Sequence, residues 1–146
     1  MRFMILVKGN RDTEAGVIPD ESLFAAMAEY HEELAKAGVL LDASGLQPTS
    51  KGARIRFSGG KRIWVDGPFT ESKEIVAGYA ILQYGSKEEA IEWTKRFVNV
   101  DAPGRMNQTA ECELRPFFEI EDFPVDSKEK PGGWRDIETN FRDGKN

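Results

Sequence analysis

The chain has 146 residues, of which 40% are hydrophobic and 31% charged, and this fits one soluble domain with its own core. Its net charge of −5 argues against a nucleic-acid partner, because binding to phosphates needs a basic surface. The single cysteine, Cys112, excludes a disulfide within the chain and favours a reducing, cytoplasmic location. No apolar stretch approaches the length of a membrane span.

The first third of the sequence predicts a strand, a helix and a second strand. Phe3–Val7 is a compact apolar run typical of a buried strand, and residues 9–19 are predicted to be a loop. Between Asp20 and Ala37 apolar side chains recur at helical spacing, and Asp20 is suited to cap the helix. A short strand is predicted at Val39–Asp42. The apolar stripe of the helix comprises Leu23, Phe24, Met27, Tyr30, His31 and Leu34.

A β-hairpin is predicted around Gly59-Gly60. We favour a three-residue loop, because it pairs Phe57 with Ile63 and keeps the apolar side chains on one face. The same register places Arg56 next to Trp64, where a cation–π contact can form.

The second half predicts two more strands with a helix between them. Ile75–Tyr84 is a long strand that is apolar on both faces. Ser86–Glu89 has the pattern of a capping box that opens a helix. Thr109–Phe117 alternates apolar and charged residues as a last strand, with Cys112 on its apolar half. The element order is that of a ferredoxin-like βαββαβ fold of the α+β class, with an inserted β-hairpin.

Two helices can cover only one face of such a sheet, although two of its strands are apolar on both faces. We therefore expect a second copy of the chain to cover the other face, which makes the protein a homodimer. Residues 1–118 form the predicted domain, and residues 119–146 form a polar C-terminal extension. This extension either docks through a helical face or remains disordered. The face consists of Trp134, Ile137 and Phe141.

A turn motif carries the clearest family signal in the chain. It reads Asp66-Gly67-Pro68-Phe69-Thr70-Glu71 and is followed by Lys73-Glu74 and Gly78-Tyr79. With Gly45–Pro48 and Glu113–Pro116 in the same order, the sequence resembles the DGPF group of the YCII-related proteins. The resemblance spans roughly residues 1–123. It implies a ferredoxin-like domain that dimerises as an α+β barrel.

The resemblance also implies several functions. Relatives of this kind include a small dehalogenating enzyme that acts on a chlorinated hydroxyquinol, and others are proposed to use a His–Asp pair in a cleft. Some are encoded beside extracytoplasmic-function sigma factors or fused to them. On this chain the histidine position of the pair falls on Met27, and the aspartate falls near Asp101. The single histidine, His31, lies one turn after Met27.

Two residues are candidates for acid–base chemistry. His31 lies at the edge of its helical stripe and can act as a general base if a carboxylate orients it. The alternative is a histidine at the edge of the core that bonds to the backbone. Asp66 either serves as an acid–base group at the mouth of a cleft or ends its strand and pairs with Arg54.

A second group of residues is expected to bind a ligand. If the outer sheet face lines a dimer cavity, Tyr79, Glu113 and Arg115 can grip an anionic or hydroxylated small molecule, with Trp64 as a further contact. The alternative is an ordinary solvated strand face or a salt bridge between subunits. We expect no cofactor and no metal, because Glu71 and Glu74 have no second histidine to join them.

The sequence therefore favours a small-molecule-binding protein, acting as a sensor or accessory protein linked to sigma-factor regulation. The alternative is a small cofactor-independent enzyme, with lyase or dehalogenase-like proton transfer by a carboxylate or histidine base in the dimer cleft.

Overall fold

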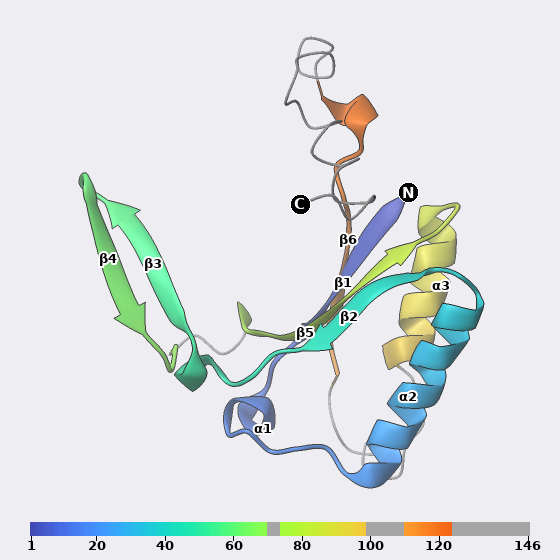
Figure 1. Cartoon of the computed structure of the whole chain (residues 1–146), viewed down its shortest axis with the longest axis horizontal. Coiled ribbons are helices and arrows are strands. Elements are labelled where there is room, and N and C mark those ends of the chain that lie inside the picture. Colours follow the sequence, from blue (N-terminus) through green and yellow to red (C-terminus); the bar gives the residue numbers. More distant parts are fainter. Residues whose placement is uncertain (70–73, 99–109, 124–146) are drawn as a thin grey trace, which may run out of the picture.

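In the computed structural model the described residues are 1–69, 74–98 and 110–123. Within these ranges the chain has a mixed α+β architecture with three α-helices and six strands (Figure 1). Asp101 and the predicted tail residues Trp134, Ile137 and Phe141 lie outside the described ranges. None of the helices in the described ranges is both long and apolar enough to cross a membrane. The elements are β1 (Arg2–Lys8), α1 (Arg11–Glu14), α2 (Glu21–Lys36), β2 (Leu40–Gly45), the 3-10 turn η1 (Thr49–Lys51), β3 (Ala53–Ser58), β4 (Lys61–Asp66), β5 (Val76–Gln83), α3 (Lys87–Val98), β6 (Cys112–Pro116) and the 3-10 turn η4 (Ile120–Asp122).

Four strands form an antiparallel sheet in the order β2-β5-β1-β6. Helices α2 and α3 both lie on one side of this sheet, and the hairpin β3–β4 projects on the other side (Figure 1). Because successive side chains of a strand point to opposite faces, Phe3 and Ile5 of β1 face the helices and are buried. Met4 and Leu6 face the opposite side, which we call the open face.

Helix α2 begins and ends as its sequence predicts. The side chain of Asp20 accepts a hydrogen bond from the backbone N–H of Leu23 at 2.9 Å, and Gly38 follows the helix with φ of 69°. Tyr30 packs in the core and donates its hydroxyl to the carbonyl of Trp93 at 2.8 Å, which joins α2 to α3. Burial raises the pKa of Tyr30 to about 12, so this donor stays protonated. The core residues are Phe3, Ile5, Tyr30, Leu34, Ala80, Leu82, Tyr84, Ala90 and Phe97.

The prediction of a loop over residues 9–19 is wrong in part, because α1 lies within it. Its four residues are too few to show an apolar period. The available signal was the pair Asn10 and Thr13, whose side chains cap each other's backbone N–H groups at 2.8 and 3.0 Å.

The predicted hairpin forms, but its predicted register is wrong. Gly59 and Gly60 both have positive φ, at 57° and 75°, and make a two-residue turn whose twist suits the strands. Phe57 therefore lies opposite Arg62, and Arg56 lies opposite Ile63 rather than beside Trp64. Matching of apolar faces could not decide the register, because every residue of both strands is exposed.

The base of the hairpin is fastened to η1 and α1 through Thr49. The N–H of Gly67 donates to the carbonyl of Gly52 at 3.1 Å, and the N–H of Phe69 donates to the Thr49 hydroxyl oxygen at 3.1 Å. Thr49 in turn donates both its backbone N–H and its hydroxyl to the carboxylate of Glu14. Residues 66–69 of the turn motif thus hold the hairpin at a defined angle to the domain.

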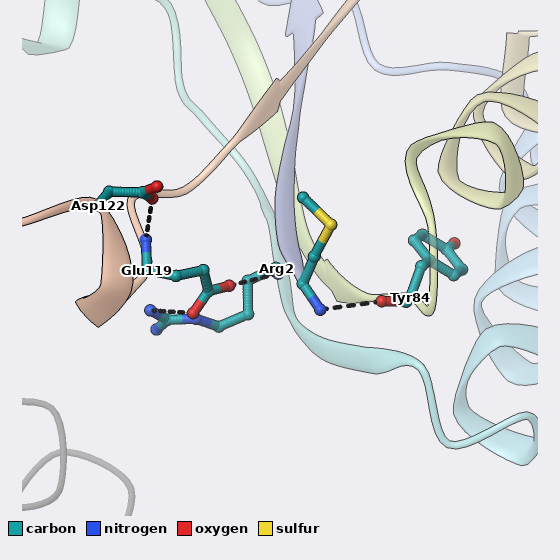
Figure 2. Close-up of polar contacts among 5 residues, drawn as sticks. Arg2, Tyr84, Glu119 and Asp122 are labelled. Atoms are coloured by element: carbon teal, nitrogen blue, oxygen red, sulfur yellow. Dashed lines mark hydrogen bonds and ion pairs between the residues drawn. The ribbon is translucent and has the colours of Figure 1, made fainter.

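The segment after β6 returns to the start of β1 (Figure 2). Glu119 accepts a hydrogen bond from the N–H of Arg2 at 2.9 Å and lies 3.7 Å from its guanidinium. The N–H of Glu119 is bound by the Asp122 carboxylate at 2.7 Å, and the Met1 amine donates to the carbonyl of Tyr84 at 3.0 Å. These contacts fix the end of the sheet at which β1 begins.

We predict that Gly67→Ala destabilises the protein by about 2–4 kcal/mol, the range of severe single substitutions. A Cβ at this position would lie 1.7 Å from the backbone oxygen of Thr49, so the base of the hairpin must shift. Chemical denaturation checks the free energy of unfolding. The matched control is Gly45→Ala, whose Cβ would meet no atom within 4 Å. Equal stability of the two variants would contradict the close approach.

Candidate functional site

A cavity of about 460 Å³ lies between α2 and the sheet. This volume is within the usual range for small-molecule sites. Helix α2 forms one wall, the ends of β1 and β5 form the opposite wall, and most of the lining is apolar. We call it the α2 cavity. Its lining comprises Val7, Lys8, Asn10, Thr13, Pro19, Leu23, Phe24, Met27, Ala28, His31, Ala77, Phe97, Ala110 and Glu111.

His31 is the one imidazole of the chain and belongs to this lining. Its Nδ1 lies 2.7 Å from the backbone carbonyl oxygen of Met27, one helical turn earlier. A carbonyl oxygen can only accept, so Nδ1 carries the proton in this contact. In the neutral ring, Nε2 is then an acceptor. Within the described residues Nε2 has no hydrogen-bond partner.

Three of the other four polar side chains of the α2 cavity are already engaged, and the fourth is that of Glu111. Asn10 and Thr13 bind each other's backbone N–H groups in the cap of α1. The ammonium of Lys8 lies 2.9 Å from the carboxylate of Glu113. His31 Nε2 is therefore an available hydrogen-bonding atom in a mostly apolar space.

The two acid–base candidates do not meet. Asp66 lies at the end of β4 and accepts a hydrogen bond from the indole N–H of Trp64 at 2.6 Å. Arg54, its predicted partner, instead stacks over the ring of Phe69, with 4.0 Å from the guanidinium carbon to the ring centre. No carboxylate of the described residues is hydrogen-bonded to His31. Its ring is oriented by a backbone carbonyl, as the second of the sequence-based alternatives expects.

The predicted ligand-binding residues divide between the open face and the hairpin. In the sheet register, Tyr79 and Glu113 both lie opposite Leu6, and Arg115 lies opposite Met4. Trp64 lies on the hairpin and is 63% exposed. The structure thus brings Glu113 and Arg115 together on the open face but leaves Trp64 with Asp66.

Lys8 organises the charges at one end of the open face. Its ammonium contacts Glu113 at 2.9 Å and Glu74 at 3.6 Å, while Arg115 lies 3.7 Å from Glu113. The hydrogen bond between Lys8 and Glu113 raises the pKa of Lys8 and lowers the pKa of Glu113. These charges satisfy one another, so the cluster is better suited to hold strands together than to grip a free anion.

Tyr79 forms a second polar pair on the same face. Its hydroxyl donates to the carboxylate of Asp42 at 2.8 Å, and this bond raises the pKa of Tyr79. The sequence-based account overlooked Lys8 and Asp42 as partners on this face. For Lys8 the available signal was strand alternation, since it follows Leu6 by two residues. In the described ranges, no group of three or more His, Cys, Asp or Glu side chains is arranged to hold a metal ion.

We predict that Glu113→Gln lowers thermal stability near neutral pH and that the difference from the wild type shrinks in acid. A carboxylate with a lowered folded pKa stabilises the fold above its unfolded pKa of about 4.5 and loses this contribution as pH falls through the folded pKa. Melting temperatures measured from about pH 7 to about pH 3 check it. The control Glu92→Gln alters an ion pair exposed on α3. A difference for Glu113→Gln that is independent of pH would contradict the assignment.

Two comparisons with known proteins bear on the family of the chain. A family model described as the YCII-related domain matches residues 1–117. The chain is also 30% identical over 97 residues to an uncharacterized protein of Rhizobium meliloti (strain 1021), an alignment that covers 66% of this chain and 74% of the relative. The chain therefore belongs to the YCII-related domain family.

Proposed function

We propose that the protein binds a small, mostly apolar molecule in the α2 cavity. The observation that carries this proposal is a mostly apolar space of about 460 Å³ that His31 lines, with Nε2 of this residue free of any hydrogen-bond partner among the described residues. Ligand sites commonly combine an apolar wall with a few polar atoms that fix the orientation of the ligand.

The acceptor on His31 specifies the kind of ligand. A molecule that donates a hydrogen bond, such as a phenol or another hydroxylated ring, satisfies Nε2, while its apolar part contacts Leu23, Phe24 and Met27. A typical hydrogen bond contributes about 1 kcal/mol net, or roughly a fivefold change in affinity. The pocket is therefore expected to prefer a hydroxylated ring over the same ring without its hydroxyl by about this factor.

A second candidate is a cofactor-independent enzyme in which His31 removes a proton from the ligand. The fixed tautomer supports it, because Nε2 is the atom that would take the proton. No carboxylate of the described residues is hydrogen-bonded to His31 to stabilise the resulting imidazolium, and Asp66 is bonded to Trp64 instead. Binding is therefore the better supported function of the two.

We further propose that the domain is ferredoxin-like, of the DGPF type, and forms a homodimer through the open face. The strand order β2-β5-β1-β6 and the two helices on one side support this arrangement. Met4, Leu6 and Ile81 give the open face an apolar centre that no described helix covers. A sensor or accessory role beside a sigma factor stays a prediction from the resemblance. The α2 cavity supports ligand binding and does not bear on that role.

Phenol and toluene test the proposed ligand class, because phenol carries a hydroxyl group where toluene carries a methyl group. We expect the wild type to bind phenol about fivefold more tightly than toluene, and we expect His31→Phe to lose this preference while still binding toluene. Ligand-observed NMR titration measures both affinities. The control Leu23→Trp fills the cavity and should weaken the binding of both probes equally.

Two outcomes would count against the proposal. If neither probe binds the wild type at millimolar concentration, the α2 cavity does not accept small rings. If phenol keeps its preference in His31→Phe, another group provides the acceptor. Hydrogen-bond rescue in His31→Gln, whose amide oxygen also accepts, would strengthen the assignment of Nε2.

A further inference from the structure

The hairpin β3–β4 is the part of the described chain with the least internal support. Its two strands pair with each other and with no further strand of the described residues. All twelve positions, six in each strand, are exposed. A two-stranded hairpin is marginally stable in water unless it packs against another surface. This hairpin therefore needs a contact that a single described subunit does not provide.

One face of the hairpin is apolar to an unusual degree. The register places Ile55 opposite Trp64, and Phe57 follows Ile55 on the same face. These side chains are 68%, 63% and 73% exposed, respectively. Exposed patches of large apolar residues usually mark interaction sites. The group of Ile55, Phe57 and Trp64 is called the arm patch below.

The direction of the hairpin is set by its base. Gly67 approaches Thr49 too closely for any side chain, and Thr49 is bound by Glu14 and Phe69. The hairpin thus projects on the side of the sheet opposite α2 and α3 (Figure 1). The open face lies on this same side of the sheet, so a single partner covering that side would meet both surfaces.

Charge favours a second copy of this chain as that partner. The hairpin carries Arg54, Arg56, Lys61 and Arg62 against Asp66 alone, whereas the whole chain has a net charge of −5. The remainder of the chain is therefore strongly acidic. The open face presents the carboxylates of Asp42, Glu74 and Glu113 around its apolar centre, and Lys8 and Arg115 lie among them. Of the cations of the hairpin, Arg62 lies on the same face as Ile55, Phe57 and Trp64, since it is opposite Phe57. This face of the hairpin therefore matches the apolar centre of the open face, and Arg62 suits the carboxylates around it.

We propose that the hairpin β3–β4 is a docking arm that packs the arm patch against the open face of a second copy. This inference rests on the dimer in the proposed function and adds the element that clasps it. In a twofold dimer each subunit gives one arm and receives one. A buried Phe or Trp covers about 150–250 Å², so the aromatic residues of two arms supply on the order of 800 Å². This is a large part of the roughly 1,600 Å² of a standard interface.

Sedimentation equilibrium on the full chain tests the arm. We expect the wild type to dimerise and Phe57→Glu to raise the dissociation constant by about tenfold or more, as for a central apolar contact. The matched control is Ile18→Glu, which introduces the same charge at a side chain that is 77% exposed outside the hairpin. Its dissociation constant should equal that of the wild type.

A second measurement is made on the wild type, so its result does not depend on whether a variant folds. The chain is labelled with 5-fluorotryptophan, and the ¹⁹F signal of Trp64 is followed as the wild type is diluted, with Trp93 as an internal reference on the helix side. The Trp64 signal should shift across the dimer midpoint, whereas the Trp93 signal should not. Trp64→Phe assigns the resonance.

Three results would overturn the arm. A wild type that is monomeric at about 100 μM removes both the dimer and its arm. A dimer that Phe57→Glu leaves intact, with a constant Trp64 signal, keeps the dimer but rejects the arm. A Trp64 signal that is shielded from solvent even in the monomer means that another segment of the same chain covers the arm patch. None of these results bears on the phenol preference of the α2 cavity, so the two proposals fail separately.

Discussion

Strand β1 is apolar on both of its faces, whereas helices cover one face of its sheet. On the helix-facing side, the side chains of Phe3 and Ile5 are fully buried, together with Leu34 of α2 and Leu82 of β5. Met4 and Leu6 lie on the other side in a partly buried position. This asymmetry divides the domain into two halves. The helix side contains the α2 cavity, and the open face has apolar side chains that no described helix covers. The proposed ligand site and the proposed interface follow from it.

The turn motif at residues 66–69 works mainly through its backbone. Gly67 is required by the approach of Thr49, and the N–H of Phe69 is bound by the hydroxyl of the same residue. Thr49 is held in turn by Glu14 of α1, so a short helix near the start of the chain fixes the base of a hairpin far along it. Asp66 ends β4 and binds Trp64. The motif therefore explains the direction in which the hairpin projects.

His31 shows how a single backbone contact can prepare a side chain for function. The Met27 carbonyl fixes the proton on Nδ1 and leaves Nε2 as an acceptor in an apolar space. An acceptor in mostly apolar surroundings favours a donor more strongly than it would in water. Without a carboxylate behind the ring, the same geometry supports recognition better than proton removal. The charged groups of the open face instead satisfy one another through Lys8.

The sequence by itself determined the elements whose signals are local. The period of the apolar stripe and the cap at Asp20 define α2, while Ser86 and Glu89 define the start of α3, because these contacts span four residues or fewer. The apolar runs of Phe3–Val7 and Ile75–Tyr84 also predicted the strands β1 and β5. What depended on distant parts of the chain was decided only by the tertiary structure. The register of the hairpin followed from the positive φ angles of Gly59 and Gly60, since an exposed ribbon has no buried face to impose an apolar match. The separation of His31 from Asp66 and the pairing of Lys8 with Glu113 likewise arise where strands and helices far apart in sequence meet, and no local pattern encodes such distances.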